Sequence, residues 1–347
     1  MWSFRNNRLL EPVDITVANL MAALGRYQGR QELYRHQAPQ VLETLRQVAI
    51  VESAEASNRI EGITVPSHRL QALMAQAVPE TRSESEIAGY RDLLARIHTG
   101  QIGLPLTPES ILALHADLYA YLPGQGGQWK QRDNVIRQTL PDGREVVRFV
   151  PLPADETPAA MQELCEQFAV MWDSEQVDRL LVINAFTLDL LCIHPFTDGN
   201  GRVARLLTLI LLYAAGYEVG RYISLERIIE QTKETYYEAL WRSSQRWESG
   251  QHDLTPWHQY SLSVLIYAYR EFEERVGQMA AVPGIKSQAV RQAIEAIASG
   301  QTFTIADLER LCPGVSRATI RRILEKMREQ KQVSCLGTGR SAQWRKL

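Results

Sequence analysis

The segment 194–205, His-Pro-Phe-Thr-Asp-Gly-Asn-Gly-Arg-Val-Ala-Arg, contains a dense set of reactive side chains and glycines. It lies between two strongly apolar stretches, residues 179–192 and 206–217. Gly199 and Gly201 allow the backbone to approach a ligand closely. The helix predicted to begin near them offers free N–H groups, which suit an anion and above all a phosphate.

The charged side chains of this segment suit a polyphosphate with its metal. Arg202 and Arg205 are three residues apart and share one helix face, where two guanidinium groups would bind phosphate oxygens. Asp198 adds an oxygen ligand of the kind that Mg²⁺ takes alongside phosphates. Pro195 cannot continue a helix, so His194 is expected at a helix end, and its pKa suits a general base at neutral pH. Together these groups predict a phosphoryl- or nucleotidyl-transfer site.

The common phosphate-binding motifs are missing from the chain. The sequence contains neither the Walker pattern GxxxxGK[ST] nor the kinase motifs, which disfavours those sites. The plain alternative is a loop whose histidine caps a helix and whose arginines are solvated. That alternative suits a lone histidine or an arginine pair, but not the whole constellation.

The segment resembles the signature of the Fic (filamentation induced by cAMP) family, HPFx[DE]GN[GK]RxxR, and matches it at every specified position. The resemblance extends over about residues 39–269. It implies an enzyme that transfers AMP from ATP to a Tyr, Ser or Thr hydroxyl of a target protein. Some relatives use another diphosphate donor or another phosphoryl group. Because Asp198 and both arginines are present, ATP is the expected donor here.

The same resemblance implies a role for individual residues. His194 would be the base that deprotonates the target hydroxyl, and Asp198 would hold Mg²⁺. Tyr237 would pack on the adenine, although core packing explains it almost equally well. The phosphates would be bound by five residues of the signature: Gly199, Asn200, Gly201, Arg202 and Arg205.

A second motif lies at the end of the helix predicted over residues 39–60. Ser57 and Glu61 are four residues apart and are followed by Gly62, which alone would be an ordinary solvated pair with a glycine cap. Next to a Fic core it resembles the inhibitory pattern [ST]xxxE[GN]. This implies that Glu61 pairs with Arg205 and removes a ligand of the γ-phosphate, so that the enzyme is autoinhibited. Alternatively, Glu61 would position water, and the protein would remove AMP from its target.

The elements around these motifs predict a mainly α protein, an all-helical core with a β-hairpin flap. Apolar periodicity predicts the helix over residues 39–60. A hairpin is expected from residues 134–139 and 145–150, because Leu-Pro-Asp-Gly at 140–143 is a turn signal. An exposed hairpin would hold a target segment as an added strand, or would simply be a surface feature. Further helices are expected over residues 84–98, 108–121, 158–172, 179–192, 224–248 and 256–276.

The C-terminal end predicts a small separate module after a linker at 280–286. Its expected order is a helix at 304–311, a helix at 316–330, and strands at 333–336 and 343–346, as in a winged helix. Arg321 and Arg322 on the second helix and Arg340 in the wing suit contact with DNA. Contact with protein only, or a role in dimer geometry, is the alternative. The expected domains are an N-terminal helical region with the inhibitory helix at 1–100, a catalytic core at 101–278 and the winged helix at 285–347.

Composition limits the class of protein. A chain of 347 residues with 45% hydrophobic and 22% charged residues is typical of a globular protein of two or three units. The net charge of −2 argues against nonspecific nucleic-acid binding by the chain as a whole. Residues 316–347, however, contain nine Lys/Arg and two Asp/Glu, a local charge of +7.

Cysteine usage and apolar runs indicate the compartment. The four cysteines are far apart and form no CxxC pair, so neither a disulfide framework nor a zinc site is expected. The N-terminus lacks the apolar region of a signal peptide, and the longest apolar run is too short for a membrane span. A cytoplasmic protein is expected, without membrane contact, and the Fic resemblance allows a homodimer. A nucleotide-sensing DNA-binding regulator is the competing class, which intact His194 and Asp198 disfavour.

Overall fold

The structure is a computed structural model that describes residues 2–37, 39–139, 144–280, 290–291, 293–295, 297, 301–312, 315–337 and 342–347. The chain divides into two compact units. The larger consists of Met1–Arg26 with Gln47–Tyr269, and the smaller of Tyr27–Arg46 with Arg270–Leu347.

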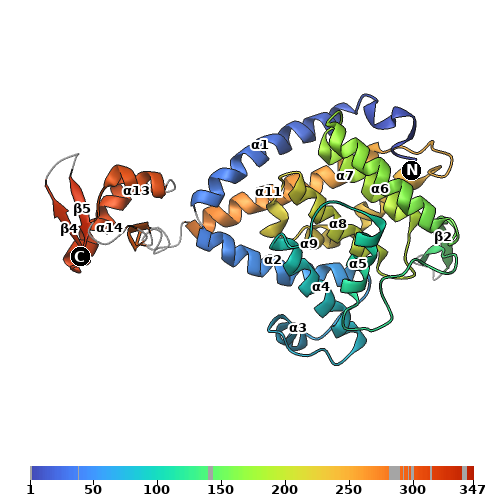
Figure 1. Ribbon diagram of the computed structural model, residues 1–347, viewed down its shortest axis with the longest axis horizontal. Helices are drawn as coiled ribbons and strands as arrows, with labels where there is room; N and C mark the ends of the chain where they lie inside the picture. Colours follow the sequence, from blue (N-terminus) through green and yellow to red (C-terminus); the bar gives the residue numbers. More distant parts are fainter. Residues whose placement is uncertain are drawn as a thin grey trace. The chain divides into compact units, whose positions relative to one another are not determined.

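The described chain is predominantly helical (Figure 1). Its helices, in chain order, are η1 Arg5–Leu10, α1 Ile15–Gln37, α2 Pro39–Ile60, α3 Ser67–Met74, α4 Arg82–His98, α5 Pro108–Leu118, α6 Thr157–Ser174, α7 Arg179–Ile193, α8 Asn200–Ala214, η2 Val219–Arg221, α9 Leu225–Gln231, α10 Lys233–Ser244, α11 Thr255–Ala280, α13 Ile305–Leu311 and α14 Arg317–Glu329. Its strands are β1 Ile136–Thr139, β2 Glu145–Phe149, β3 Thr302–Thr304, β4 Val333–Leu336 and β5 Gln343–Lys346.

The helix α7 is the centre of the larger unit. Every residue from Leu180 to Ile193 is buried, as its nearly continuous apolar sequence predicts. It packs against α6, α8 and α10, and α8 also packs against α4 and α5. Each fully buried Leu, Ile or Phe side chain contributes about 1.5–3 kcal/mol. The segment between α7 and α8 is therefore held at both ends by a well-packed core.

Most predicted elements of the larger unit are confirmed. The predicted boundaries of α2 agree with the structure, and the strands β1 and β2 pair in antiparallel orientation. The prediction of one helix over residues 224–248 is wrong. The chain breaks at Thr232 into α9 and α10, where the Thr232 hydroxyl donates to the backbone oxygen of Ile228 at 2.7 Å. The turn expected at 140–143 lies outside the described residues.

The C-terminal elements form a small core of their own. Residues of α13, α14, β4 and β5 enclose it, among them Leu308, Ile320, Leu324 and Trp344. The strands are antiparallel in the order β3-β5-β4. Thr304 and Ser316 cap α13 and α14, which begin near the predicted residues, whereas the strand β3 was not expected. Arg340 of the predicted wing and most of the linker expected at 280–286 lie outside the described residues.

Among the helices of the described chain, none combines the length and the hydropathy that crossing a bilayer requires.

Candidate active site

The loop between α7 and α8 reverses the chain. His194, the C-cap of α7, adopts the left-handed conformation with φ 52° and ψ 61°. At the other end Gly199, the N-cap of α8, has φ 83°, a conformation that favours glycine. The loop thereby places His194 beside the N-terminus of α8, whose first turn contains Gly201 and Arg202.

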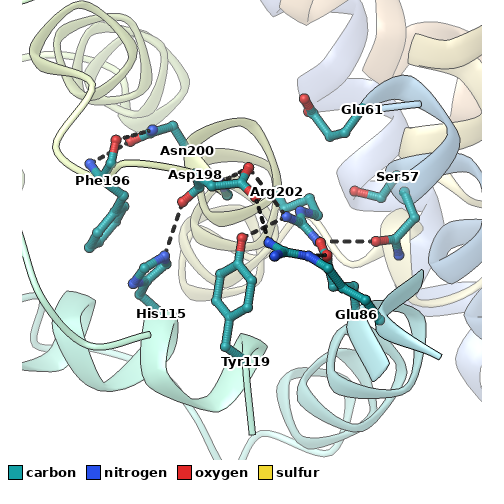
Figure 2. Close-up of polar contacts among 12 residues, drawn as sticks. Ser57, Glu61, Glu86, His115, Tyr119, Phe196, Asp198, Asn200 and Arg202 are labelled. Carbon is teal, nitrogen blue, oxygen red and sulfur yellow. Dashed lines mark hydrogen bonds and ion pairs between the residues drawn. The ribbon is translucent and has the colours of Figure 1, made fainter. Parts of the chain in front are cut away.

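Asn200 closes this loop. Its side-chain oxygen accepts from the backbone N–H of Phe196 at 2.9 Å, and its amide donates to the backbone oxygen of Phe196 at 2.7 Å (Figure 2). Phe196 itself is buried, stacked between His115 and Trp129 with ring centroids 3.7 Å and 5.3 Å away. The side chain of Asn200 thus holds the loop closed, and its role in binding phosphate stays a prediction.

His115 supports the loop from α5. Its Nδ1 accepts from the backbone N–H of Gly127 at 3.0 Å, so the proton lies on Nε2, which donates to the backbone oxygen of Asp198 at 3.1 Å (Figure 2). Both contacts require the neutral imidazole, since a second N–H would face the Gly127 donor. Burial lowers the pKa of His115 to about 4, which agrees with this state.

Arg202 lies beneath the loop, not in an open site. Its side chain is 0% exposed, with Nη1 donating to Glu86 at 2.5 Å and Nη2 donating to the Tyr119 hydroxyl at 2.8 Å (Figure 2). The Asp198 carboxylate lies 3.6 Å from Nη2. Arg202 is thus held by Glu86 and Tyr119 in this structure, and its role as a phosphate ligand beside Arg205 stays a prediction.

Arg205 is bound by the end of α2. Its Nη2 donates to Oε1 of Glu61 at 2.8 Å and to the backbone oxygen of Ser57 at 2.9 Å, and its Nε donates to the Ser57 hydroxyl at 2.9 Å. Burial alone would lower the pKa of Arg205, but the nearby Glu61 carboxylate raises it above its ordinary value. The ion pair that the sequence predicts between Glu61 and Arg205 is therefore present.

A cavity of about 680 Å³ opens beside these groups, which is within the range of small-molecule binding sites. It is lined by His194 and Gly201 from the loop and α8, by Arg205, by Glu61, and by residues of the hairpin and α10. Tyr237 is among the lining residues, whereas Gly199, Asp198, Asn200 and Arg202 are not. Of the predicted site residues, His194, Gly201, Arg205, Glu61 and Tyr237 therefore line this cavity.

The sequence of this chain is similar to a known family of proteins. Residues 105–212 match the family model described as Fic/DOC family. The chain carries a Fic/DOC domain. A curated relative, the protein adenylyltransferase Fic of Drosophila mojavensis, is 28% identical over 191 residues, which is 52% of this chain and 35% of that protein. The chain therefore spans about a third of the length of the curated relatives that it matches. The corresponding protein of Drosophila grimshawi is also 28% identical over 191 residues.

Solved structures establish the fold. A Fic family protein from Desulfovibrio desulfuricans G20 superposes with a TM-score of 0.62 and 22% identity over 97% of both chains. Fic-1 from C. elegans, residues 134–508, gives a TM-score of 0.55 with 19% identity over 76% of this chain and 73% of that one. The helical Fic fold is thus shared with proteins of low sequence identity.

His194 of the Fic domain is in a state suited to a base. Burial, to which the nearby Lys130 cation adds, lowers its pKa to about 4, so that the imidazole is neutral at pH 7. Its Nδ1 faces the backbone oxygen of Leu191 at 3.4 Å, which favours a proton on Nδ1. The lone pair is then on Nε2, the nitrogen available to take a proton from a substrate.

Asp198 fits a metal that arrives with phosphates. Its carboxylate is 58% exposed and faces two cations, Arg202 at 3.6 Å and Arg82 at 3.7 Å. Within the described residues, no group of three or more His, Cys, Asp or Glu could hold a metal. Mg²⁺ is commonly bound through one carboxylate together with substrate phosphates and waters, so a single Asp198 fits this mode.

Several residues that shape the site were not predicted: Arg82, Glu86, His115, Tyr119 and Lys130. They come from α4, α5 and the segment before β1, and no local motif marks them. Only tertiary packing brings them to the loop.

Proposed function

We propose that this chain transfers AMP from ATP to a Tyr, Ser or Thr hydroxyl of a target protein. The observation that carries the proposal is the cavity itself, which combines a neutral imidazole, a helix N-terminus and the Arg205 guanidinium. The protein adenylyltransferase names of the Drosophila relatives point to the same reaction.

The proposed step balances around the α-phosphorus. The target oxygen forms a bond to this atom while the bond to the bridging oxygen of the β-phosphate breaks, so that pyrophosphate leaves. Nε2 of His194 takes the hydroxyl proton. The N–H groups around Gly201 and the Arg205 guanidinium stabilise negative charge on the phosphates. Mg²⁺ held by Asp198 would neutralise phosphate charge when bound.

Glu61 is proposed as a brake on this reaction. Arg205 cannot serve a γ-phosphate fully while it pairs with the Glu61 carboxylate, because both anions need the same guanidinium donors. The end of α2 is fastened by Lys233, which donates to the backbone oxygen of Ile60 at 2.8 Å, and by Ser53, which donates to Glu226 at 2.7 Å. Release therefore requires movement of the Glu61 side chain, which is 31% exposed, and not of the helix.

Transfer of label from [α-³²P]ATP with Mg²⁺ to proteins of a cell lysate tests the proposal. Wild type, Glu61→Gly, and Glu61→Gly combined with His194→Ala are compared. We expect weak labelling, strong labelling and none, in that order. If Glu61→Gly binds ATP but labels nothing, removal of AMP becomes the better explanation. The matching assay is release of AMP from a modified protein by the wild type, lost in Glu61→Ala.

The C-terminal helix α14 supports a second proposal, contact with DNA. Its apolar face is buried through Ile320 and Leu324, whereas Arg321 and Arg322 are exposed within the segment of local charge +7. Fluorescence anisotropy with duplex DNA should give an affinity that falls with salt and is reduced by Arg321→Ala with Arg322→Ala. Equal affinity of the wild type and the double variant would argue for a protein-contact role.

A further inference from the structure

The conformation of His194 needs support from outside the loop. A left-handed residue with a side chain costs about 1–2 kcal/mol, and a residue that precedes proline is also disfavoured in helical conformations. His194 has φ 52° and ψ 61° and is followed by Pro195. Without further contacts, the loop would relax toward an extended conformation and move the imidazole.

Lys130 provides contacts on both sides of this residue. Its Nζ donates to the backbone oxygen of Ile193 at 3.0 Å, and its own backbone N–H donates to the backbone oxygen of Pro195 at 2.8 Å. The residues before and after His194 are thus bound by one lysine. Because Ile193 ends α7, its carbonyl also presents the partial negative charge of a helix C-terminus to the ammonium group.

The remaining donors of Lys130 fix the lysine itself. Nζ also donates to the backbone oxygen of Leu152 at 2.5 Å and to the side-chain oxygen of Asn134 at 3.1 Å. The residue is 2% exposed, and each of these ammonium contacts is to an uncharged oxygen. A buried ammonium group with three acceptors is held in a single position, which makes it a rigid support.

We propose that Lys130 is the positioning residue of the Fic site, because its ammonium group and backbone N–H together hold His194 in the left-handed turn that presents the imidazole to the cavity. The inference rests on the proposed role of His194 as base. Lys130 is not among the residues that line the cavity, so it acts through His194 and not on the substrate.

The charge of Lys130 adds a second effect. Burial lowers the pKa of Lys130 to about 8, with Asp133 partly offsetting this, so the group remains largely protonated at pH 7. Apart from burial, the Lys130 cation is the largest influence that lowers the pKa of His194. Removing it should therefore raise the pKa of His194, whereas a purely structural lysine in another part of the fold would not.

Three variants in the Glu61→Gly background separate position from charge. Lys130→Met removes the side-chain hydrogen-bond donor and the positive charge. Lys130→Gln keeps a donor without the charge, and Lys130→Arg keeps the donor and the charge. Arg179→Met, which removes a partly exposed cation at the start of α7, is the matched control. We expect Lys130→Met to lower kcat about 10- to 100-fold at a KM for ATP within about threefold of the parent. Lys130→Arg should retain the larger part of kcat.

A titration of histidine-labelled protein by NMR, with the His194 signal assigned through His194→Ala, is independent of catalysis. The pKa of His194 should rise by at least about 0.5 in Lys130→Met and Lys130→Gln. It should be unchanged in Arg179→Met. Should Lys130→Met fail to fold, Lys130→Gln provides the same reading.

The proposal is overturned if the His194 signal and its titration are the same in the Lys130 variants and the control. It is also overturned if kcat per folded molecule stays within about twofold of the parent. Absence of transfer in the Glu61→Gly parent would instead contradict the proposed function, and the titration would still decide the role of Lys130.

Discussion

Arg205 donates from Nη2 to Oε1 of Glu61 at 2.8 Å, on the floor of the cavity that also contains His194. The guanidinium is buried and the carboxylate is partly exposed. Breaking the pair by moving Glu61 into water costs less than moving Arg205, because the carboxylate is already near solvent. The pair is therefore suited to a reversible switch in which the carboxylate moves and the arginine stays.

Gly201→Ala tests this switch by steric means. A Cβ at residue 201 would overlap Oε1 of Glu61 and would lie 3.1 Å from Nη1 of Arg205. Since the carboxylate is the end of a flexible side chain, it should move away. We expect transfer to rise about 3- to 30-fold above the wild type, measured with [α-³²P]ATP.

The control for this variant is Gly25→Ala, where an added Cβ meets nothing within 4 Å. If Gly201→Ala releases the brake, adding Glu61→Gly should produce little further increase. Activity equal to that of the wild type, at unchanged ATP affinity, would contradict the steric argument.

Ser57→Ala should weaken the brake without removing it. Arg205 would lose the hydrogen bond from Nε to the Ser57 hydroxyl but keep its contacts with Glu61 and the backbone. A hydrogen bond to a charged group contributes about 1.5–3 kcal/mol. We expect initial rates between those of the wild type and Glu61→Gly. The control is Ser263→Ala, which removes an exposed hydroxyl of α11 and should leave the rate at the wild-type value. If Ser57→Ala also gives the wild-type rate, the Ser57 hydroxyl has no role in the brake.

The pH dependence of transfer follows from the lowered pKa of His194. The base must be neutral to accept a proton, and a pKa of about 4 keeps it neutral throughout the range above pH 5. The kcat of Glu61→Gly should therefore stay nearly constant from pH 8 down to about 5.5. An activity that is halved near pH 6.5 would mean that His194 titrates as an ordinary exposed histidine.

His115→Leu should destabilise the loop in a pH-dependent way. The change leaves the Gly127 N–H and the Asp198 carbonyl without a partner, which costs about 2–4 kcal/mol at pH 7. The folded pKa of His115 is depressed to about 4. Its contribution to stability is thus present above the unfolded value near 6.5 and is lost as the pH falls toward 4.

Urea unfolding at pH 7.0 and pH 5.0 measures this effect. The difference in unfolding free energy between the wild type and His115→Leu should be smaller at pH 5.0. His68→Leu, which replaces an exposed histidine of α3, should leave the unfolding free energy at the wild-type value at both pH values. An equal loss at both pH values would show that His115 does not need to stay neutral in the fold.

Much of the larger unit could be predicted because its signals are local. The boundaries of α2 and the nearly continuous burial of α7 follow from apolar periodicity and run length. The capping residues Thr304 and Ser316 likewise mark their helices. The break at Thr232 was not predicted. Its hydroxyl bonds to the backbone oxygen of Ile228 and contacts the Tyr260 hydroxyl of α11, a partner that no local pattern marks.

In the site, too, local sequence signals could be predicted, whereas tertiary contacts could not. The signature indicated which residues surround the loop, but not which of them face the cavity. Arg202 and Arg205 share a helix face in the sequence pattern, yet Glu86 of α4 and Tyr119 hold the first in the interior. Asn200 likewise contacts Phe196 inside the loop. These partners are set by tertiary packing, which a linear motif does not encode.

Transfer of a nucleotidyl group is tested by giving Glu61→Gly ATP that is labelled either at the α- or at the γ-phosphate. We expect that label from the α-phosphate becomes covalently attached to a protein hydroxyl, while label from the γ-phosphate is released with pyrophosphate. Attachment of the γ-label alone would contradict it and would make the protein a phosphoryl transferase.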